Sequence, residues 1–129
     1  MTALVVDDDF ASRMVIQRYL LSFGSTDVAT DGVEAVALYK AALEKKQRYD
    51  LVCLDIMLPG KSGQTVLKEI RQLEVDHGIP QGKGARVIMV SALGDRETVL
   101  EAIQRCDAYL VKPIQMTDLV THLKRFGLV

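Results

Sequence analysis

Four aspartates of this chain come directly after apolar runs, at positions where their carboxylates could meet. Asp7, Asp8 and Asp9 follow the first apolar run, and Asp55 follows a later one. Carboxylates gathered within a few ångströms repel one another unless a cation neutralises them. A set of oxygen ligands without histidine or cysteine suits a hard ion, and Mg²⁺ fits best because it combines a few carboxylates with several waters. We therefore predict a Mg²⁺ site formed by Asp7, Asp8 and Asp55.

A serine and a lysine follow two further apolar runs and could complete a site for a phosphoryl group. Ser91 comes after the fourth run and Lys112 after the fifth. A metal ion and an ammonium group together neutralise phosphoryl oxygens, while a hydroxyl donates a hydrogen bond to one of them. In such a site Asp55 is a carboxylate nucleophile, and the product is an aspartyl phosphate. Each residue alone is more often a helix cap, a turn residue or a surface charge, so the prediction depends on their combination.

Five short apolar runs alternate with segments of helical spacing, including one marked by Val99 and Ile103. Four of the runs are almost continuously apolar, which is typical of strands buried on both faces of a parallel sheet. The alternation predicts one doubly wound α/β domain of five strand–helix units. If the strand order is 2-1-3-4-5, the first and third strands are neighbours, and Asp7, Asp8 and Asp55 converge on one crevice. The predicted strands are Ala3 to Val6, Asp27 to Thr30, Asp50 to Leu54, Arg86 to Val90 and Ala108 to Val111.

The bulk composition fits one compact domain and argues against several classes of protein. The chain has 129 residues, 49% hydrophobic and 26% charged, so we expect a single domain over residues 1–129. A net charge of -1, from 16 basic and 17 acidic residues, offers no electrostatic surface for nucleic acid or for an anionic membrane. The sequence has no basic leader segment and no apolar run of bilayer length, and Cys53 and Cys106 form no CxxC pair. We expect a cytoplasmic protein without a disulfide, in which both thiols lie in the core.

One polar segment, Glu74 to Ala85, is predicted to be the most flexible loop of the chain. It is rich in glycine and separates the third helical segment from the fourth strand. A tolerated surface insertion is the simplest interpretation of its length. His77 falls in this loop and His122 in the last helical segment, and we expect both side chains to be solvated.

Four motifs make the chain similar to the receiver domains of response regulators, in particular to stand-alone regulators of the chemotaxis type. The motifs are VVDDD, LVCLDIMLPGKSG, VIMVSA and YLVKPI, and they occur in the family's order and spacing over nearly the whole chain. The resemblance implies a flavodoxin-like fold and a phosphorylation-dependent switch of a two-component phosphorelay. It also implies a regulator that catalyses its own phosphoryl transfer and is not a conventional enzyme. Such a chain is either a stand-alone regulator, which Met1 and the short tail favour, or a receiver cut from a larger regulator or hybrid kinase.

The resemblance assigns roles to the residues around the predicted metal. Asp55 resembles the phosphoacceptor, which takes a phosphoryl group from a histidine of a sensor kinase or of a phosphotransfer protein. Asp7 and Asp8 resemble the acidic pair that holds Mg²⁺, Asp8 directly and Asp7 largely through water. Met57 occupies the position whose backbone carbonyl completes the metal shell. Asp9 has no metal role, and we expect it to cap the first helix or to face solvent.

The last two strands carry residues that resemble the family's switch. Ser91 resembles the hydroxyl that follows the phosphoryl group, and Ala92 is the small residue expected after it. Lys112 resembles the lysine that pairs with the phosphoryl oxygens, and the Lys112–Pro113 bond is similar to one that the family holds in cis. Tyr109 resembles the aromatic residue that turns inward on activation. The resemblance implies that the signal reaches a protein target through the fourth helix, the fifth strand and the fifth helix.

Two apolar positions beside the site depart from many chemotaxis-type members. Met57 and Leu93 stand where those members carry polar residues that help to orient the hydrolytic water, so we expect slow self-dephosphorylation.

Other classes of protein fit the sequence less well than a receiver domain. A phosphatase of the haloacid-dehalogenase type requires a second acidic residue at the position of Met57. A flavodoxin-like cofactor binder requires a phosphate-binding loop after the first strand, where Asp7, Asp8 and Asp9 would repel a phosphate. A scaffold that is never phosphorylated would normally have lost one of the site residues.

Overall fold

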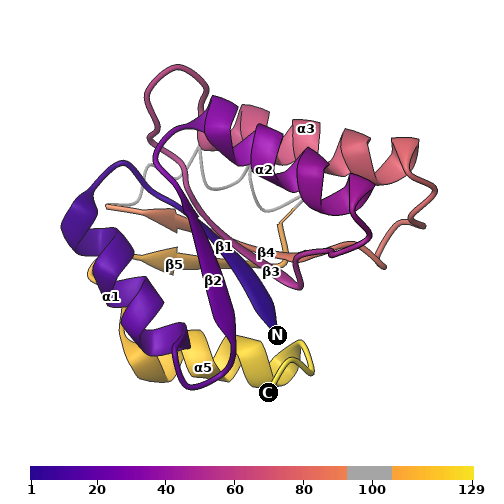
Figure 1. Ribbon diagram of the computed structural model, residues 1–129. Coiled ribbons are helices and arrows are strands. Elements are labelled where there is room, and N and C mark those ends of the chain that lie inside the picture. The colour runs from indigo at the N-terminus through magenta and orange to yellow at the C-terminus, as the bar shows by residue number, and fades with distance from the viewer. Residues whose placement is uncertain (93–105) are drawn as a thin grey trace.

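Five parallel strands form the centre of the structure, a computed structural model that describes residues 1–92 and 106–129. The strand order is β2-β1-β3-β4-β5, as the sequence predicts, so β1 and β3 lie side by side (Figure 1). The predicted fourth helix and Leu93 lie outside the described residues. The strands are β1 (Thr2–Val6), β2 (Ser25–Ala29), β3 (Leu51–Asp55), β4 (Arg86–Ser91) and β5 (Ala108–Val111).

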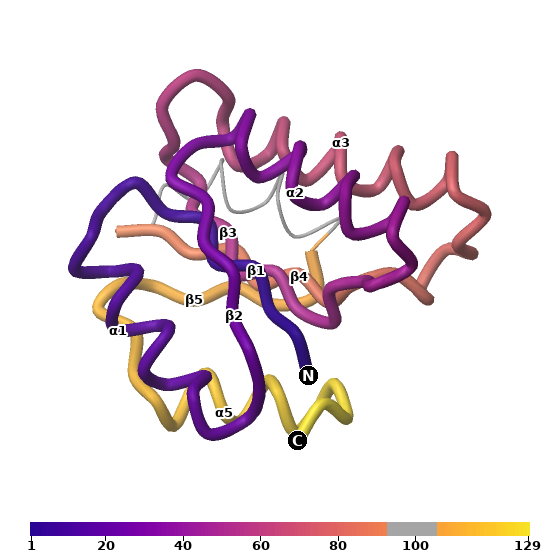
Figure 2. The backbone as a smooth tube through the Cα atoms, in the orientation of Figure 1, coloured from indigo at the N-terminus to yellow at the C-terminus, as the bar shows by residue number. Residues whose placement is uncertain are grey.

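Helices cover both faces of this sheet. Figures 1 and 2 show α1 and α5 on one face, and α2 and α3 on the other. Successive residues of a strand point to opposite faces. In β1, Leu4 therefore joins the buried cluster under α2 and α3, and Val5 joins the cluster under α1 and α5. This burial on both sides explains the continuous apolar runs of the sequence. The helices are α1 (Phe10–Leu20), α2 (Gly32–Glu44), α3 (Gly63–Asp76) and α5 (Met116–Arg125).

Four of the five strands, all but β5, differ from the prediction by one or two residues at one or both ends. The sequence predicts β2 over Asp27 to Thr30, whereas the strand is Ser25–Ala29. Thr30 leaves the strand because its hydroxyl donates to the carboxylate of Glu34 (3.1 Å), at the start of α2. Asp50 stands just before β3, where its carboxylate accepts a hydrogen bond from the first backbone N–H of β1 (2.8 Å). These local side-chain bonds compete with strand pairing.

The prediction of a loop from Glu74 to Ala85 is wrong at its first residues, which belong to a helix. α3 continues to Asp76, and only residues 77–85 are irregular. Glu74 is 5% exposed and accepts hydrogen bonds from the hydroxyl of Tyr39 and from the backbone N–H of Ala85 (2.9 Å). Arg71 pairs with its other oxygen (2.7 Å). A buried carboxylate therefore ties the returning end of the loop to α2 and α3, a role that its polar surroundings in the sequence conceal.

The cysteines and histidines largely follow the prediction. Cys53 and Cys106 are free thiols; Cys53 is buried and Cys106 is half-buried, and burial raises the pKa of both. His77 is exposed as expected. The prediction for His122 is wrong, because its ring is half-buried and stacks on Phe126 with ring centroids 6.2 Å apart. Burial lowers the pKa of His122, and the charge of a neighbouring arginine lowers it further.

Within the described residues, no helix is long and apolar enough to cross a membrane.

Candidate functional site

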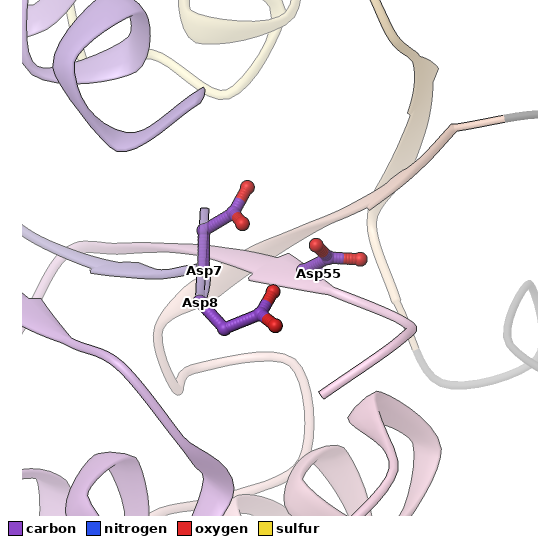
Figure 3. A group of neighbouring side chains, drawn as sticks. All are labelled: Asp7, Asp8 and Asp55. Carbon is purple, nitrogen blue, oxygen red and sulfur yellow. The ribbon is translucent and has the colours of Figure 1, made fainter. Parts of the chain in front are cut away.

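Three carboxylates lie together where β1 and β3 end (Figure 3). The two strands are paired in parallel, so the residues that follow them leave the sheet at the same edge. One carboxylate oxygen each of Asp7, Asp8 and Asp55 lies within 4.8 Å of the others. Asp7 is 1% exposed and Asp55 is 5% exposed, whereas Asp8 is open to solvent. The predicted convergence of these three side chains is confirmed.

Asp7 is held by contacts to both its main chain and its side chain. Its backbone N–H donates to the carbonyl of Ala29 (3.1 Å), and its backbone carbonyl accepts from the guanidinium of Arg13 (3.1 Å). One carboxylate oxygen accepts from the backbone N–H of Asp9 (2.9 Å), and the other pairs with the ammonium of Lys112 (2.8 Å). The position of this carboxylate is therefore fixed before any cation binds.

Asp9 caps α1, as expected for the aspartate without a metal role. Its carboxylate accepts hydrogen bonds from the backbone N–H (3.3 Å) and the hydroxyl (2.8 Å) of Ser12. The carboxylate is exposed, and these two bonds lower the pKa of Asp9. Because Asp9 is the N-cap, α1 begins at Phe10, directly after the acidic residues that follow β1.

α3 approaches the backbone of Asp55 closely, a contact that the sequence analysis missed. The backbone N–H of Gly63 donates to the carbonyl of Ile56 (2.8 Å), and a Cβ at Gly63 would overlap the carbonyl oxygen of Asp55. The glycine in KSG is the signal that could have indicated this contact. One carboxylate oxygen of Asp55 accepts from the backbone N–H of Met57 (2.9 Å). Burial raises the pKa of Asp55, the nearby charge of Asp7 adds to this, and the bonds from Lys112 and Met57 oppose it.

Lys112 connects the two buried carboxylates. Its ammonium lies 2.8 Å from an oxygen of Asp7 and 3.0 Å from an oxygen of Asp55. The residue follows β5, its backbone N–H donates to the carbonyl of Ser91 (2.7 Å), and the Lys112–Pro113 bond is cis. Burial alone would lower the pKa of Lys112, but hydrogen bonds and charges from the two carboxylates outweigh it and raise the pKa. The ammonium thus neutralises part of the negative charge of the cluster.

The other predicted residues lie around this centre. Ser91 ends β4 at the same edge of the sheet and is buried. The side chain of Met57 is 75% exposed beside Asp55, and Ala92 is exposed. Tyr109 lies on β5, three positions before Lys112 and packed against the cluster under α2 and α3. Its buried hydroxyl has no hydrogen-bond partner in the part of the chain that the structure describes.

The donor set fits a hard divalent cation. All three clustered side chains offer carboxylate oxygens, and one lysine leaves the set with excess negative charge. Asp8 is exposed, so water can reach the cluster from its side. Mg²⁺ keeps several water ligands when it binds to proteins. A buried carboxylate beside a bound cation and an ammonium can attack a phosphoryl group.

Known proteins resemble this chain in sequence and in structure. The family described as Response regulator receiver domain matches residues 3–124. The chemotaxis protein CheY of Bacillus subtilis is 38% identical over 115 residues, which cover 87% of this chain and 85% of that protein. A chain in the crystal structure of the CheX–CheY–BeF₃–Mg²⁺ complex from Borrelia burgdorferi has a TM-score of 0.81 and 31% identity, with 98% of this chain and 89% of that chain covered. The receiver domain of the histidine kinase CKI1 from Arabidopsis thaliana, complexed with Mg²⁺ and BeF₃⁻, has a TM-score of 0.82 and 27% identity, with the same coverage of 98% and 89%.

Proposed function

The chain belongs to the response regulator receiver family, and on that basis we propose that Asp55 accepts a phosphoryl group from a phosphohistidine in a Mg²⁺-dependent transfer. Members of this family are phosphoacceptor regulators and not conventional enzymes. The observation that carries the assignment is the buried carboxylate of Asp55, 3.0 Å from the ammonium of Lys112 and clustered with Asp7 and Asp8. Among the described residues, Asp55 is the one aspartate of the cluster that lies inside a strand, between β1 and β4.

The proposed transfer exchanges one bond to phosphorus for another. An oxygen of Asp55 attacks the phosphorus atom, the bond from phosphorus to the donor imidazole breaks, and the imidazole nitrogen keeps the electron pair. The attacking carboxylate must be ionised. Burial raises the pKa of Asp55, and the hydrogen bond from Lys112 counteracts that rise. Lys112 and Ser91 are the groups proposed to donate hydrogen bonds to the transferred phosphoryl group.

Mg²⁺ is the cofactor that this donor set suits. Asp7, Asp8, Asp55 and the backbone carbonyl of Met57 would hold the ion. When bound, it neutralises the oxygens of the phosphoryl group. Two solved relatives support this choice, because the structures from Borrelia burgdorferi and Arabidopsis thaliana contain Mg²⁺ together with BeF₃.

Phosphorylation by a small donor tests the assignment of Asp55. The wild-type protein, incubated with acetyl phosphate and Mg²⁺, should gain one phosphoryl group by mass spectrometry, and Asp55→Asn should gain none. Asp76→Asn, a matched change at an exposed aspartate of α3, should behave as wild type. An unmodified wild-type protein, or a phosphoryl group that persists in Asp55→Asn, would refute the proposal.

The switch and the output partner follow from the same site. A phosphoryl group on Asp55 adds negative charge beside Ser91 and Lys112, which biases a two-state equilibrium. Tyr109 is the proposed moving residue, because its buried hydroxyl lacks a partner within the described residues and it lies on the strand that leads to Lys112. The proposed target is a protein bound by the fourth helix, β5 and α5. The residues predicted to form the fourth helix lie outside the described residues, and β5 and α5 are adjacent along the chain.

The proposed partners are a histidine donor upstream and a protein target downstream, without nucleic acid. The donor is a sensor histidine kinase or a histidine phosphotransfer protein, as a receiver requires. We propose that residues 1–129 form one receiver domain. Its relatives include both a stand-alone protein, CheY of Bacillus subtilis, of which the match covers 85%, and a longer one, the two-component response regulator ORR24 of Oryza sativa, of which it covers 18%.

The exposed side chain of Met57 predicts slow loss of the phosphoryl group. An apolar side chain beside Asp55 cannot orient a hydrolytic water, so Met57→Asn should shorten the half-life of the phosphorylated protein roughly tenfold. The decay of phosphorylated protein after removal of acetyl phosphate measures this. Val75→Asn, an exposed apolar position near the far end of α3, is the matched control. Equal half-lives of wild type and Met57→Asn, or a wild-type decay as fast as in rapid chemotaxis regulators, would contradict the prediction.

A further inference from the structure

Arg13 is a cation that lies beside the acidic cluster without pairing with it. Its guanidinium donates to the backbone carbonyl of Asp7 (3.1 Å) and lies over the ring of Phe10, 5.6 Å from the ring centroid. Within the described residues, Arg13 forms no ion pair with a carboxylate. Arg13 is half-buried near the start of α1, so this arrangement lies where the chain passes from β1 into the helix.

The carbonyl that Arg13 holds belongs to the peptide group between Asp7 and Asp8. Asp7 is fixed independently by Ala29, Asp9 and Lys112. No hydrogen bond in the described part of the chain holds the side chain of Asp8, which is open to solvent but lies with Asp7 in the cluster (Figure 3). The Asp8 side chain is therefore held only through its backbone, which includes the peptide group that Arg13 contacts.

We infer that Arg13 is a positioning residue for the metal, acting through this peptide to place the Asp8 carboxylate beside those of Asp7 and Asp55. The inference rests on the Mg²⁺ site of the proposed function. Groups that orient metal ligands commonly contribute about 10–100-fold to metal affinity. A purely electrostatic effect has the opposite sign, because a guanidinium near the site repels a second cation. The sign of the change in affinity therefore separates the two roles.

Calorimetric titration of the unphosphorylated protein with Mg²⁺ tests the inference. Arg13→Met keeps an apolar stem against Phe10 but removes the donor, and should weaken Mg²⁺ binding about tenfold. Arg13→Lys keeps a charged donor on a flexible stem of similar length and should recover most of the affinity. Arg18→Met removes an exposed positive charge from the last turn of α1 and should leave the affinity unchanged or slightly raised.

Phosphorylation by acetyl phosphate provides a second measurement. In Arg13→Met the Mg²⁺ concentration for half-maximal rate should rise about tenfold while the maximal rate at saturating Mg²⁺ stays near that of wild type. Equal or tighter Mg²⁺ binding by Arg13→Met, or a lowered maximal rate with an unchanged Mg²⁺ requirement, would overturn the inference while leaving the proposed function intact. A wild-type protein that binds no Mg²⁺ would overturn both. Urea denaturation of each variant establishes that it is folded.

Discussion

Replacing Lys112 with methionine should lower the rate of phosphorylation by acetyl phosphate roughly 100-fold at saturating Mg²⁺. Its ammonium lies within 3.0 Å of both Asp7 and Asp55, so it is placed to meet the oxygens of a phosphoryl group that arrives at Asp55. Methionine has a similar length and volume but donates no hydrogen bond. The measurement is the initial rate of phosphoryl incorporation by mass spectrometry. Lys40→Met, at an exposed lysine of α2, should leave the rate unchanged.

The same variant should also be less stable than wild type when Mg²⁺ is absent. Loss of Lys112 leaves two buried carboxylates without their shared cation, which should cost about 3 kcal/mol in the free energy of unfolding near neutral pH. Mg²⁺ should restore most of this loss, because it binds the folded state and neutralises the same carboxylates. Urea denaturation with and without Mg²⁺ measures both effects.

The loss of stability in Lys112→Met should depend on pH with a defined sign. Burial raises the pKa of Asp55 above its usual value of 3.8, and Lys112 opposes that rise, so Lys112→Met should raise the pKa further. A carboxyl whose pKa is raised on folding contributes stability that is present below the unfolded pKa and is lost as pH rises through the folded pKa. The difference in unfolding free energy between wild type and variant should therefore grow as pH increases from about 4 to 7. A difference that is constant over this range would mean that Lys112 does not set the ionisation of Asp55.

The main parts of the site could be predicted from the sequence because they depend on a short physical argument. Buried parallel strands must be apolar throughout, so their ends are visible as the first polar residues, and the topology brings those ends together. That reasoning identifies Asp7, Asp55, Ser91 and Lys112, and the structure places all four at one edge of the sheet. The cis bond before Pro113 was implied by the family resemblance and is confirmed.

Two sets of contacts could not be read from the sequence, one beside the acidic cluster and one that holds the loop before β4. Arg13 bonds a backbone carbonyl, which no residue pattern marks. Glu74 stands next to a polar, glycine-rich segment and resembles a solvated residue. Arg71 is one turn earlier on the same helix, but its other two partners, Tyr39 on α2 and the backbone of Ala85 before β4, come from elsewhere in the chain. Only the assembled fold brings these groups around one carboxylate.

Because of this network, Glu74→Ala should lower the free energy of unfolding by about 3–5 kcal/mol, as expected when one partner of a buried ion pair is removed. The change leaves the hydroxyl of Tyr39 and the backbone N–H of Ala85 buried without their acceptor. Gly84 packs directly against the Glu74 carboxylate, so the loop also loses its support. Urea denaturation at neutral pH measures the loss.

Two matched variants test whether the loss of stability comes from the contacts of the Glu74 carboxylate or from replacing any glutamate. Glu74→Gln keeps an acceptor for Tyr39 and Ala85 and should lose only about 1–2 kcal/mol, mainly from the weakened contact with Arg71. Glu44→Ala, at the exposed end of α2, should change the stability by less than about 0.5 kcal/mol. Glu74 lies roughly 16 Å along α3 from Gly63, which contacts Asp55, so folded Glu74→Gln should be phosphorylated at the wild-type rate. A loss below about 1 kcal/mol in Glu74→Ala would mean that the loop is held by its backbone alone and that the buried carboxylate is dispensable.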